Sequence, residues 1–317
     1  MKHHLRVASL LFNQPLLTTP DLLDLAVRWA NQTLSLNIIS LHTAGISQGA
    51  QMMFDDDDRE QQAQRREEQR LKVIAETGIE VIPVSGVLVS RGSHLAACET
   101  MTSYEDLRRS LSRAVADPLV ERIVLDIDSP GGSAVGAFEL AADIRAATAI
   151  KPITALVNFM AYSGAYLLAA ACTEIVVSQT SGVGSIGVIA SHMDRSKMEE
   201  GMGVKVTTVY AGAHKNDLSP HEPLTAQSLQ VLNELVQDSY QMFTQQVADY
   251  RHLDVAKVIA TEAACYRGAK AIAMGLADRM QAPQQALDQL SQGIALHRQQ
   301  RQRISLQARA CAIAARL

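Results

Sequence analysis

Hydrophobic positions follow two different periods along residues 79–280. Short runs rich in Ile and Val predict strands at Ile79–Val89, Glu121–Ile127, Ile153–Val157, Glu174–Val177, Ile186–Ala190 and Val204–Tyr210. Apolar residues three or four apart predict helices at Ser103–Ala116, Ala134–Ala147, Ser163–Cys172, Ala226–Tyr250, Val255–Thr261 and Gly268–Met274, with Gly275 as a cap. Alternating strands and helices predict an α/β fold with a mostly parallel sheet.

The segments on either side of this region have a different character. Residues 1–78 form an N-terminal arm, in which Pro20–Ala30 predicts an amphipathic helix. The run Asp55–Asp58 and the polar stretch Arg59–Lys72 predict a hydrated linker or mobile helix, with metal binding by the four Asp as the weaker alternative. Residues 281–317 predict a helical tail with no acidic residue from Gln289 onward. That tail is either a solvated helix or a docking arm for an acidic protein or nucleic acid.

Composition indicates a globular enzyme with a sizeable core. The 317 residues are 47% hydrophobic and 20% charged, and the net charge of −4 gives no general argument for nucleic-acid binding. Four cysteines lack CxxC spacing, so we expect reduced thiols, no disulfide framework and no metal or other cofactor. No apolar run approaches the ~18 residues of a spanning helix, so we expect no membrane association and a cytoplasmic location.

Two glycine-containing turns carry the candidate chemistry. Ser163 and Gly164 open a helix directly after a strand, which exposes the hydroxyl and offers the next N–H to an oxyanion. The turn Ser129-Pro-Gly-Gly132 also follows a strand, so Gly131 and Gly132 would aim a second donor at the same oxygen. Each turn alone is an ordinary cap or loop, but consecutive strand–helix units bring both to one sheet edge.

The base that would activate the serine is not decided by the residues alone. His192 and His214 both follow Ser163, and Lys215 comes directly after His214. Histidine is the commonest base in enzymes. A lysine accepts a proton only in its neutral form, which requires burial, and a surface lysine is the simpler interpretation of the sequence.

A resemblance to a known family resolves this choice. The motifs that carry it are Val81-Ile-Pro-Val-Ser-Gly-Val-Leu88, Asp128-Ser-Pro-Gly-Gly132, Ser163-Gly-Ala-Tyr166, Val183-Gly-Ser-Ile-Gly-Val188, Ala211-Gly-Ala-His-Lys215 and Tyr266-Arg-Gly268 with Gly275-Leu-Ala-Asp278. Residues 79–280 resemble the S49 family of serine peptidases, the signal peptide peptidase A group. The resemblance implies a Clp protease/crotonase-like fold and a closed homo-oligomer.

The resemblance also implies a role for each candidate residue. It makes Ser163 the nucleophile, Lys215 the base and Ser185 the residue that orients the lysine. It assigns the oxyanion donors to Gly132 and Gly164, with Gly131 beside them.

Within the family, several stretches are similar to the head-maturation proteases of lambda-type tailed phages. They are Arg6–Leu17, Pro83–Arg91, Met101–Tyr104 and Gly136–Leu140. This implies protein or peptide substrates, in particular capsid, portal or scaffold proteins of a phage head. A peptidase that degrades signal peptides or other peptides in the cytosol is one alternative. A non-proteolytic, crotonase-like capsid component is the other.

Overall fold

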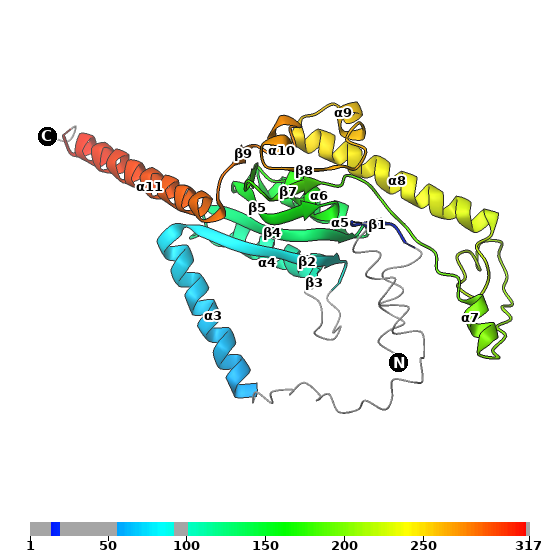
Figure 1. Cartoon of the computed structure of the whole chain (residues 1–317). Helices are drawn as coiled ribbons and strands as arrows, with labels where there is room; N and C mark the ends of the chain where they lie inside the picture. Colours follow the sequence, from blue (N-terminus) through cyan, green and yellow to red (C-terminus); the bar gives the residue numbers. More distant parts are fainter. Residues whose placement is uncertain (1–13, 20–55, 92–100, 315–317) are drawn as a thin grey trace.

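Strand β4 (Arg122–Ser133) lies at the centre of a sheet that organises the whole chain (Figure 1). The structure is a computed structural model and describes residues 14–19, 56–91 and 101–314. In that part of the chain nine strands form one sheet, whose main path runs β3-β2-β4-β5-β6-β9 with every neighbouring pair parallel. The strands besides β4 are β1 (Leu16–Leu17), β2 (Ile79–Val89), β3 (Met101–Ser103), β5 (Ile153–Tyr162), β6 (Glu174–Val177), β7 (Gly182–Gly184), β8 (Cys265–Arg267) and β9 (Arg279–Met280).

Two strands depart from the parallel pattern. β1 pairs antiparallel with β4, and β8 pairs antiparallel with β7, which itself extends β5 in parallel. The predicted α/β class with a mostly parallel sheet is confirmed.

One face of the sheet carries the larger hydrophobic core. The helices of the described chain are α3 (Asp56–Thr77), α4 (Tyr104–Ala116), α5 (Ala137–Ala147), α6 (Gly164–Ala170), α7 (Ser196–Gly201), α8 (Ala226–Arg251), α9 (Val255–Ile259), α10 (Ala269–Ala273) and α11 (Pro283–Ala314). Side chains of β2 and β4 interlock with α4, α5 and α6, and Phe243 and Val247 of α8 pack behind α6. Helix α4 begins where its sequence indicates, since the Ser103 hydroxyl accepts a hydrogen bond from the Asp106 N–H.

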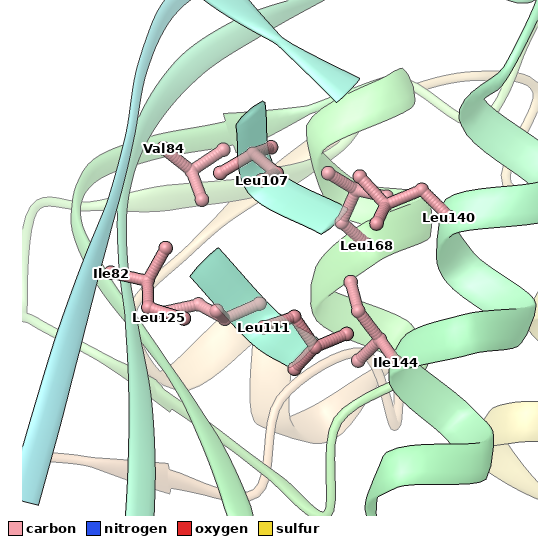
Figure 2. A pocket seen from close by; sticks show the side chains of 8 residues that line it. All are labelled: Ile82, Val84, Leu107, Leu111, Leu125, Leu140, Ile144 and Leu168. Carbon is pink, nitrogen blue, oxygen red and sulfur yellow. The ribbon is translucent and has the colours of Figure 1, made fainter. Parts of the chain in front are cut away.

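A small void remains inside this core (Figure 2). It is lined only by aliphatic side chains, from β2, β4, α4, α5 and α6: Ile82, Val84, Leu107, Leu111, Leu125, Leu140, Ile144 and Leu168. With no polar group facing it, the void is a gap in packing rather than a binding site.

The opposite face of the sheet is covered at one end by the start of α11. Ala286 and Ile294 are buried there against Val124 and Leu156 of the central strands. Arg298 forms an ion pair with Glu121, so this arginine is not a free charge of the tail. From Gln299 to Leu306 the described side chains are exposed. The tail is therefore helical as predicted, but its first turns are packed rather than solvated.

The polar stretch before the sheet is also an ordered helix. α3 runs to Thr77, and Ile74 near its end is buried in the larger core. Arg70 of α3 forms an ion pair with the buried Glu80 of β2. The predicted helix Pro20–Ala30 lies outside the described residues.

Two predicted strands are wrong. Ile186–Ala190 is irregular, because Ser185 has a positive φ of 54° and only Ile189 forms a β-bridge, to Leu16. Val204–Tyr210 is exposed and pairs with no strand of the described chain, although its alternating pattern suits one. Strands β1, β3, β7, β8 and β9 were not predicted, since each has only two or three residues.

Candidate active site

Ser163 stands at the point where β5 ends and α6 begins. Its side chain is fully buried, and its backbone has φ 52° and ψ −119°, a conformation that side-chain-bearing residues rarely adopt. The Ser163 N–H donates to the Gly184 carbonyl at 2.8 Å, and its Oγ donates to the Gly187 carbonyl at a long 3.4 Å. The hydroxyl is thus presented at the helix start without capping it.

The segment Ser129–Gly132, which the sequence predicts as a turn after a strand, instead continues strand β4, with Gly131 and Gly132 paired to Val87 and Leu88 of β2. This segment, here called the glycine turn, lies directly beside this helix start. A Cβ added to Gly131, which has a φ of +100°, would lie 3.0 Å from the Gly164 nitrogen. Gly132 is equally confined, because a Cβ there would lie 1.9 Å from the Leu88 carbonyl oxygen. The backbone of this turn therefore approaches the N-terminus of α6 more closely than any side chain would allow.

Ser185 reaches the same place from β7. Tyr162 of β5 pairs with Gly184 of β7, so Ser163 and Ser185 follow paired residues on adjacent strands. Ser185 is buried, and its N–H donates to the Ala264 carbonyl at 3.1 Å. Five of the six predicted site residues therefore converge at one edge of the sheet: Ser163, Ser185, Gly131, Gly132 and Gly164.

Lys215 is not among them. It lies in a long excursion between Ile189 and α8, here called the 190–225 arm, which contains α7. Figure 1 shows α7 and its neighbouring loops beyond the edge of the sheet, near the N-terminal end of α8. The Lys215 side chain is exposed, and the backbone N–H of this residue donates to the Gly212 carbonyl at 3.0 Å. This is not the buried environment that a lysine base requires.

The two candidate histidines differ in their surroundings. His214, in the same arm, places Nδ1 2.7 Å from Oδ2 of Asp217, and this contact lowers the pKa of the Asp217 carboxyl. His192 is partly buried at the start of the arm. Among the described residues, no group of three acidic, histidine or cysteine side chains is arranged to hold a metal ion.

Two residues hold the backbone around the glycine turn by hydrogen bonds that were not predicted from the sequence. Ser129 Oγ donates to the Gly86 carbonyl at 2.6 Å and accepts from the Gly131 N–H at 3.1 Å, which fixes the glycine turn. The buried Tyr104 hydroxyl donates to the Ser133 carbonyl at 2.7 Å, and burial raises the pKa of this phenol. Only the position of Ser129 within the turn motif signalled such a role.

Two carboxylates precede the turn on β4. Burial raises the pKa of the Asp126 carboxyl, and it also raises the pKa of the Asp128 carboxyl. Both residues alternate with Ile127, which points into the larger core, so they lie on the opposite face of the sheet from Ser163's helix.

Comparison with known proteins identifies the relatives of this chain. The model of peptidase family S49 matches residues 145–297. Capsid assembly protease C of Escherichia phage lambda is 36% identical over 274 residues, 86% of this chain and 62% of that protein. Head-tail preconnector protein GP5 of Enterobacteria phage P21 is 42% identical over 203 residues, 64% of this chain and 40% of that protein. The chain thus spans less than two thirds of the length of either relative.

A solved structure was also found. A membrane protease specific for a stomatin homolog from Pyrococcus horikoshii is 14% identical, with a TM-score of 0.40 over 66% of this chain and 76% of that chain.

Within the described residues, no helix is both long and apolar enough to cross a bilayer.

Proposed function

Since this chain belongs to peptidase family S49, we propose that it is a serine endopeptidase in which Ser163 is the nucleophile and Lys215 the base. The observation that carries the proposal is the convergence of Ser163, Ser185 and the glycine turn at one sheet edge. Because the chain belongs to this family, we also assign it the Clp protease/crotonase-like fold that the resemblance implied.

The proposed chemistry follows from these groups. Neutral Lys215 takes the proton of Ser163 while Oγ attacks the scissile carbonyl, and the tetrahedral oxyanion accepts hydrogen bonds from the Gly132 and Gly164 N–H groups. The lysine then gives its proton to the leaving amine, and water hydrolyses the resulting ester. Gly131 holds the turn in position, and Ser185 orients the lysine.

Lys215 must reach this site from elsewhere, and we assign that step to assembly. The 190–225 arm exposes apolar side chains that a monomer leaves in water: Met202, Val204, Val206, Val209 and Tyr210. Helix α8 adds the exposed side chains of Leu229, Leu235 and Met242. A second copy of the chain is the occupant that would cover both surfaces, bury a lysine and complete the site.

The proposed substrates are proteins of a phage head, processed in the host cytoplasm or inside the prohead. Support comes from the relatives, one named as a capsid assembly protease and one as a head-tail preconnector protein. The exposed arginines Arg301 and Arg303 of α11 would suit an acidic protein partner.

Labelling and kinetics test the dyad. A fluorophosphonate should label Ser163, as mapped by mass spectrometry, and Ser163→Ala should abolish labelling. With a peptide bearing small apolar side chains before the scissile bond, Ser163→Ala and Lys215→Met should each lower kcat by about 10⁴-fold or more, because nucleophile and base act as a unit. Ser185→Ala should weaken turnover without abolishing it.

The histidines provide the matched controls. His192→Ala and His214→Ala should retain most of the activity of the unmodified protein. If His192→Ala is inactive while Lys215→Met turns over normally, the base is a histidine and the proposed dyad is wrong.

A further inference from the structure

The segment Gln14–Thr19 lies across the candidate active site. Its strand β1 pairs antiparallel with the end of β4, with Leu16 opposite Ser133 and Leu17 opposite Gly132. On its other side, Leu16 forms a bridge with Ile189, and the two residues exchange hydrogen bonds of 2.8 and 3.0 Å. Figure 1 shows β1 at the end of the sheet beside β4 and α5.

The backbone of this segment bonds alternately to its two neighbours. Leu16 bonds to Ile189, whereas the Pro15 carbonyl accepts from the Ala134 N–H at 3.4 Å and Leu17 faces Gly132. An extended chain held on both sides in this way is how peptides add to a sheet edge. The space between the two flanking segments, one after the glycine turn and one after Ser185, is here called the groove, and Gln14–Thr19 fills it as an extended chain.

The Leu17 carbonyl lies in the groove next to Gly131 and Gly164. Its oxygen would lie 2.0 Å from a Cβ added to Gly131 and 3.3 Å from one added to Gly164. It therefore sits against the two backbone turns that are proposed to bind the oxyanion. Leu16 and Leu17 are 3% and 0% exposed, so the segment fills the groove rather than lying over it.

One group in the segment is poorly satisfied. Thr18 is 5% exposed, and its Oγ1 has no hydrogen-bond partner among the described residues. A buried hydroxyl without a partner weakens the bound state, since the same group is hydrogen-bonded once water reaches it. The segment is therefore held by its leucines, of which Leu17 belongs to the larger core, and by its backbone, while Thr18 favours the released state.

We propose that residues Pro15–Thr18 are a tethered occupant of the peptide groove, which holds the place of substrate and blocks Ser163 until it leaves. The ligand that replaces it is an extended peptide with apolar side chains at the positions of Leu16 and Leu17. This inference rests on the proposed function, because it takes the groove beside Ser163 to be the substrate site. Being part of the same chain, the segment competes at a high effective concentration with any free peptide.

A disulfide lock tests the proposal in the full-length chain. Leu16 and Ile189 form a hydrogen-bonded antiparallel pair, whose Cα atoms are about 5.5 Å apart and so within disulfide range. In Leu16→Cys/Ile189→Cys, oxidation should slow fluorophosphonate labelling of Ser163 at least tenfold relative to the reduced form of the same protein. Leu16→Cys alone, as the matched control, should show no response to oxidation. Equal labelling of locked and reduced forms would overturn the proposal.

A binding measurement separates this inference from the protease proposal, because it needs no catalysis. In a Ser163→Ala background, Leu17→Asp should release the segment and raise affinity for a fluorescent peptide of residues 13–19 at least tenfold. Leu119→Asp, at an exposed site, should leave the affinity unchanged. If no variant is ever labelled but Leu17→Asp gains peptide affinity, the groove inference stands and the serine mechanism fails.

Two further outcomes would count against the tethered occupant. A folded Leu17→Asp variant with unchanged peptide affinity would make β1 a permanent strand of the sheet. If Leu17→Asp does not fold, the disulfide lock decides the question alone. A new N-terminus at Thr18 in the wild type but not in Ser163→Ala would make the segment a substrate instead of a blocking strand.

Discussion

Ser163 adopts a backbone conformation that costs free energy. At φ 52° and ψ −119° a non-glycine residue is strained by about 1–3 kcal/mol, and the strain is maintained only by the surrounding structure. In this turn the hydroxyl does not cap the helix start but donates to the Gly187 carbonyl. A strained residue of this kind is typical of a site selected for function rather than stability.

Replacing Ser163 in two ways measures this strain. Ser163→Gly relieves it, since glycine adopts positive φ without penalty, whereas Ser163→Ala keeps it. Glycine also raises the conformational entropy of the unfolded chain, which offsets part of this gain. We therefore expect Ser163→Gly to be more stable than Ser163→Ala by about 1 kcal/mol, although both lack the hydroxyl. Urea unfolding of the two variants at one protein concentration checks this, and an alanine variant of equal or greater stability would contradict it.

Asp126 offers a residue-scale test of electrostatics. Burial raises the pKa of its carboxyl above the ordinary 3.8, the charge of Asp128 adds to the rise, and a hydrogen bond with Asn158 partly opposes it. Below that ordinary value the group is neutral in both folded and unfolded states. As pH rises through the folded-state pKa, the folded protein must ionise a half-buried group, so stability falls.

Asp126→Asn should therefore have a higher urea midpoint than the wild type at pH 7. The difference should shrink as pH falls toward 4, because the wild-type carboxyl then becomes neutral as well. Asp238→Asn, at an exposed position on α8, is the control and should show no comparable trend. A midpoint difference that is constant between pH 4 and 7 would show that burial of this charge is not the cause.

At the scale of elements, local sequence patterns correctly predicted features that depend on a few neighbouring residues, such as strand bounds and helix caps. Strand Ile79–Val89 was predicted with its observed bounds, because the segment is rich in Ile and Val, although Pro83 and Gly86 lie within it. Gly275 was predicted as a cap, and it ends α10 with φ +78° while the Leu276 N–H donates to the Ala271 carbonyl at 2.9 Å. The convergence of the two glycine turns also followed from consecutive strand–helix units.

Other features were beyond local signals. β1 is two residues long and is defined by pairing with residues more than a hundred positions away, so no pattern in residues 14–19 indicates it. Val204–Tyr210 has the alternation of a strand, but a strand needs a neighbour, and the described chain supplies none. The family resemblance named Lys215, yet no local rule gives the path of the arm that carries it.

The α10 cap yields an element-scale prediction. Gly275→Ala places a side chain at positive φ, and its Cβ would lie 3.1 Å from Leu253. We expect a loss of about 1–2 kcal/mol in the free energy of unfolding, with unchanged helix content by circular dichroism. Gly293→Ala is the matched control, because a Cβ there meets nothing within 4 Å, and it should be neutral or slightly stabilising. Equal effects at both positions would refute the capping role.

At the scale of the whole molecule, the chain is divided between a packed sheet and projecting parts. The sheet and its helices carry the serine and the glycine turn, whereas the 190–225 arm carries the lysine. Val209 is 93% exposed in that arm, and Leu229 and Leu235 extend the apolar surface along α8. A monomer leaves this surface in water and, in the proposed mechanism, keeps Ser163 apart from its base, whereas a closed ring would cover the surface and bring the two together.

Complementation between inactive copies tests whether the site is shared. If Lys215 reaches Ser163 of a neighbouring copy, co-expressed Ser163→Ala and Lys215→Met chains form mixed rings in which some sites join an intact serine to an intact lysine. Random mixing in equal amounts should restore about a quarter of wild-type turnover, since each residue is intact in half the copies. Co-expression of Ser163→Ala with the Ser163→Ala/Lys215→Met double variant provides no serine and should stay inactive. If sedimentation shows mixed oligomers that remain inactive while wild-type oligomers cleave peptide, each lysine serves its own chain, and the 190–225 arm must fold back onto its own sheet.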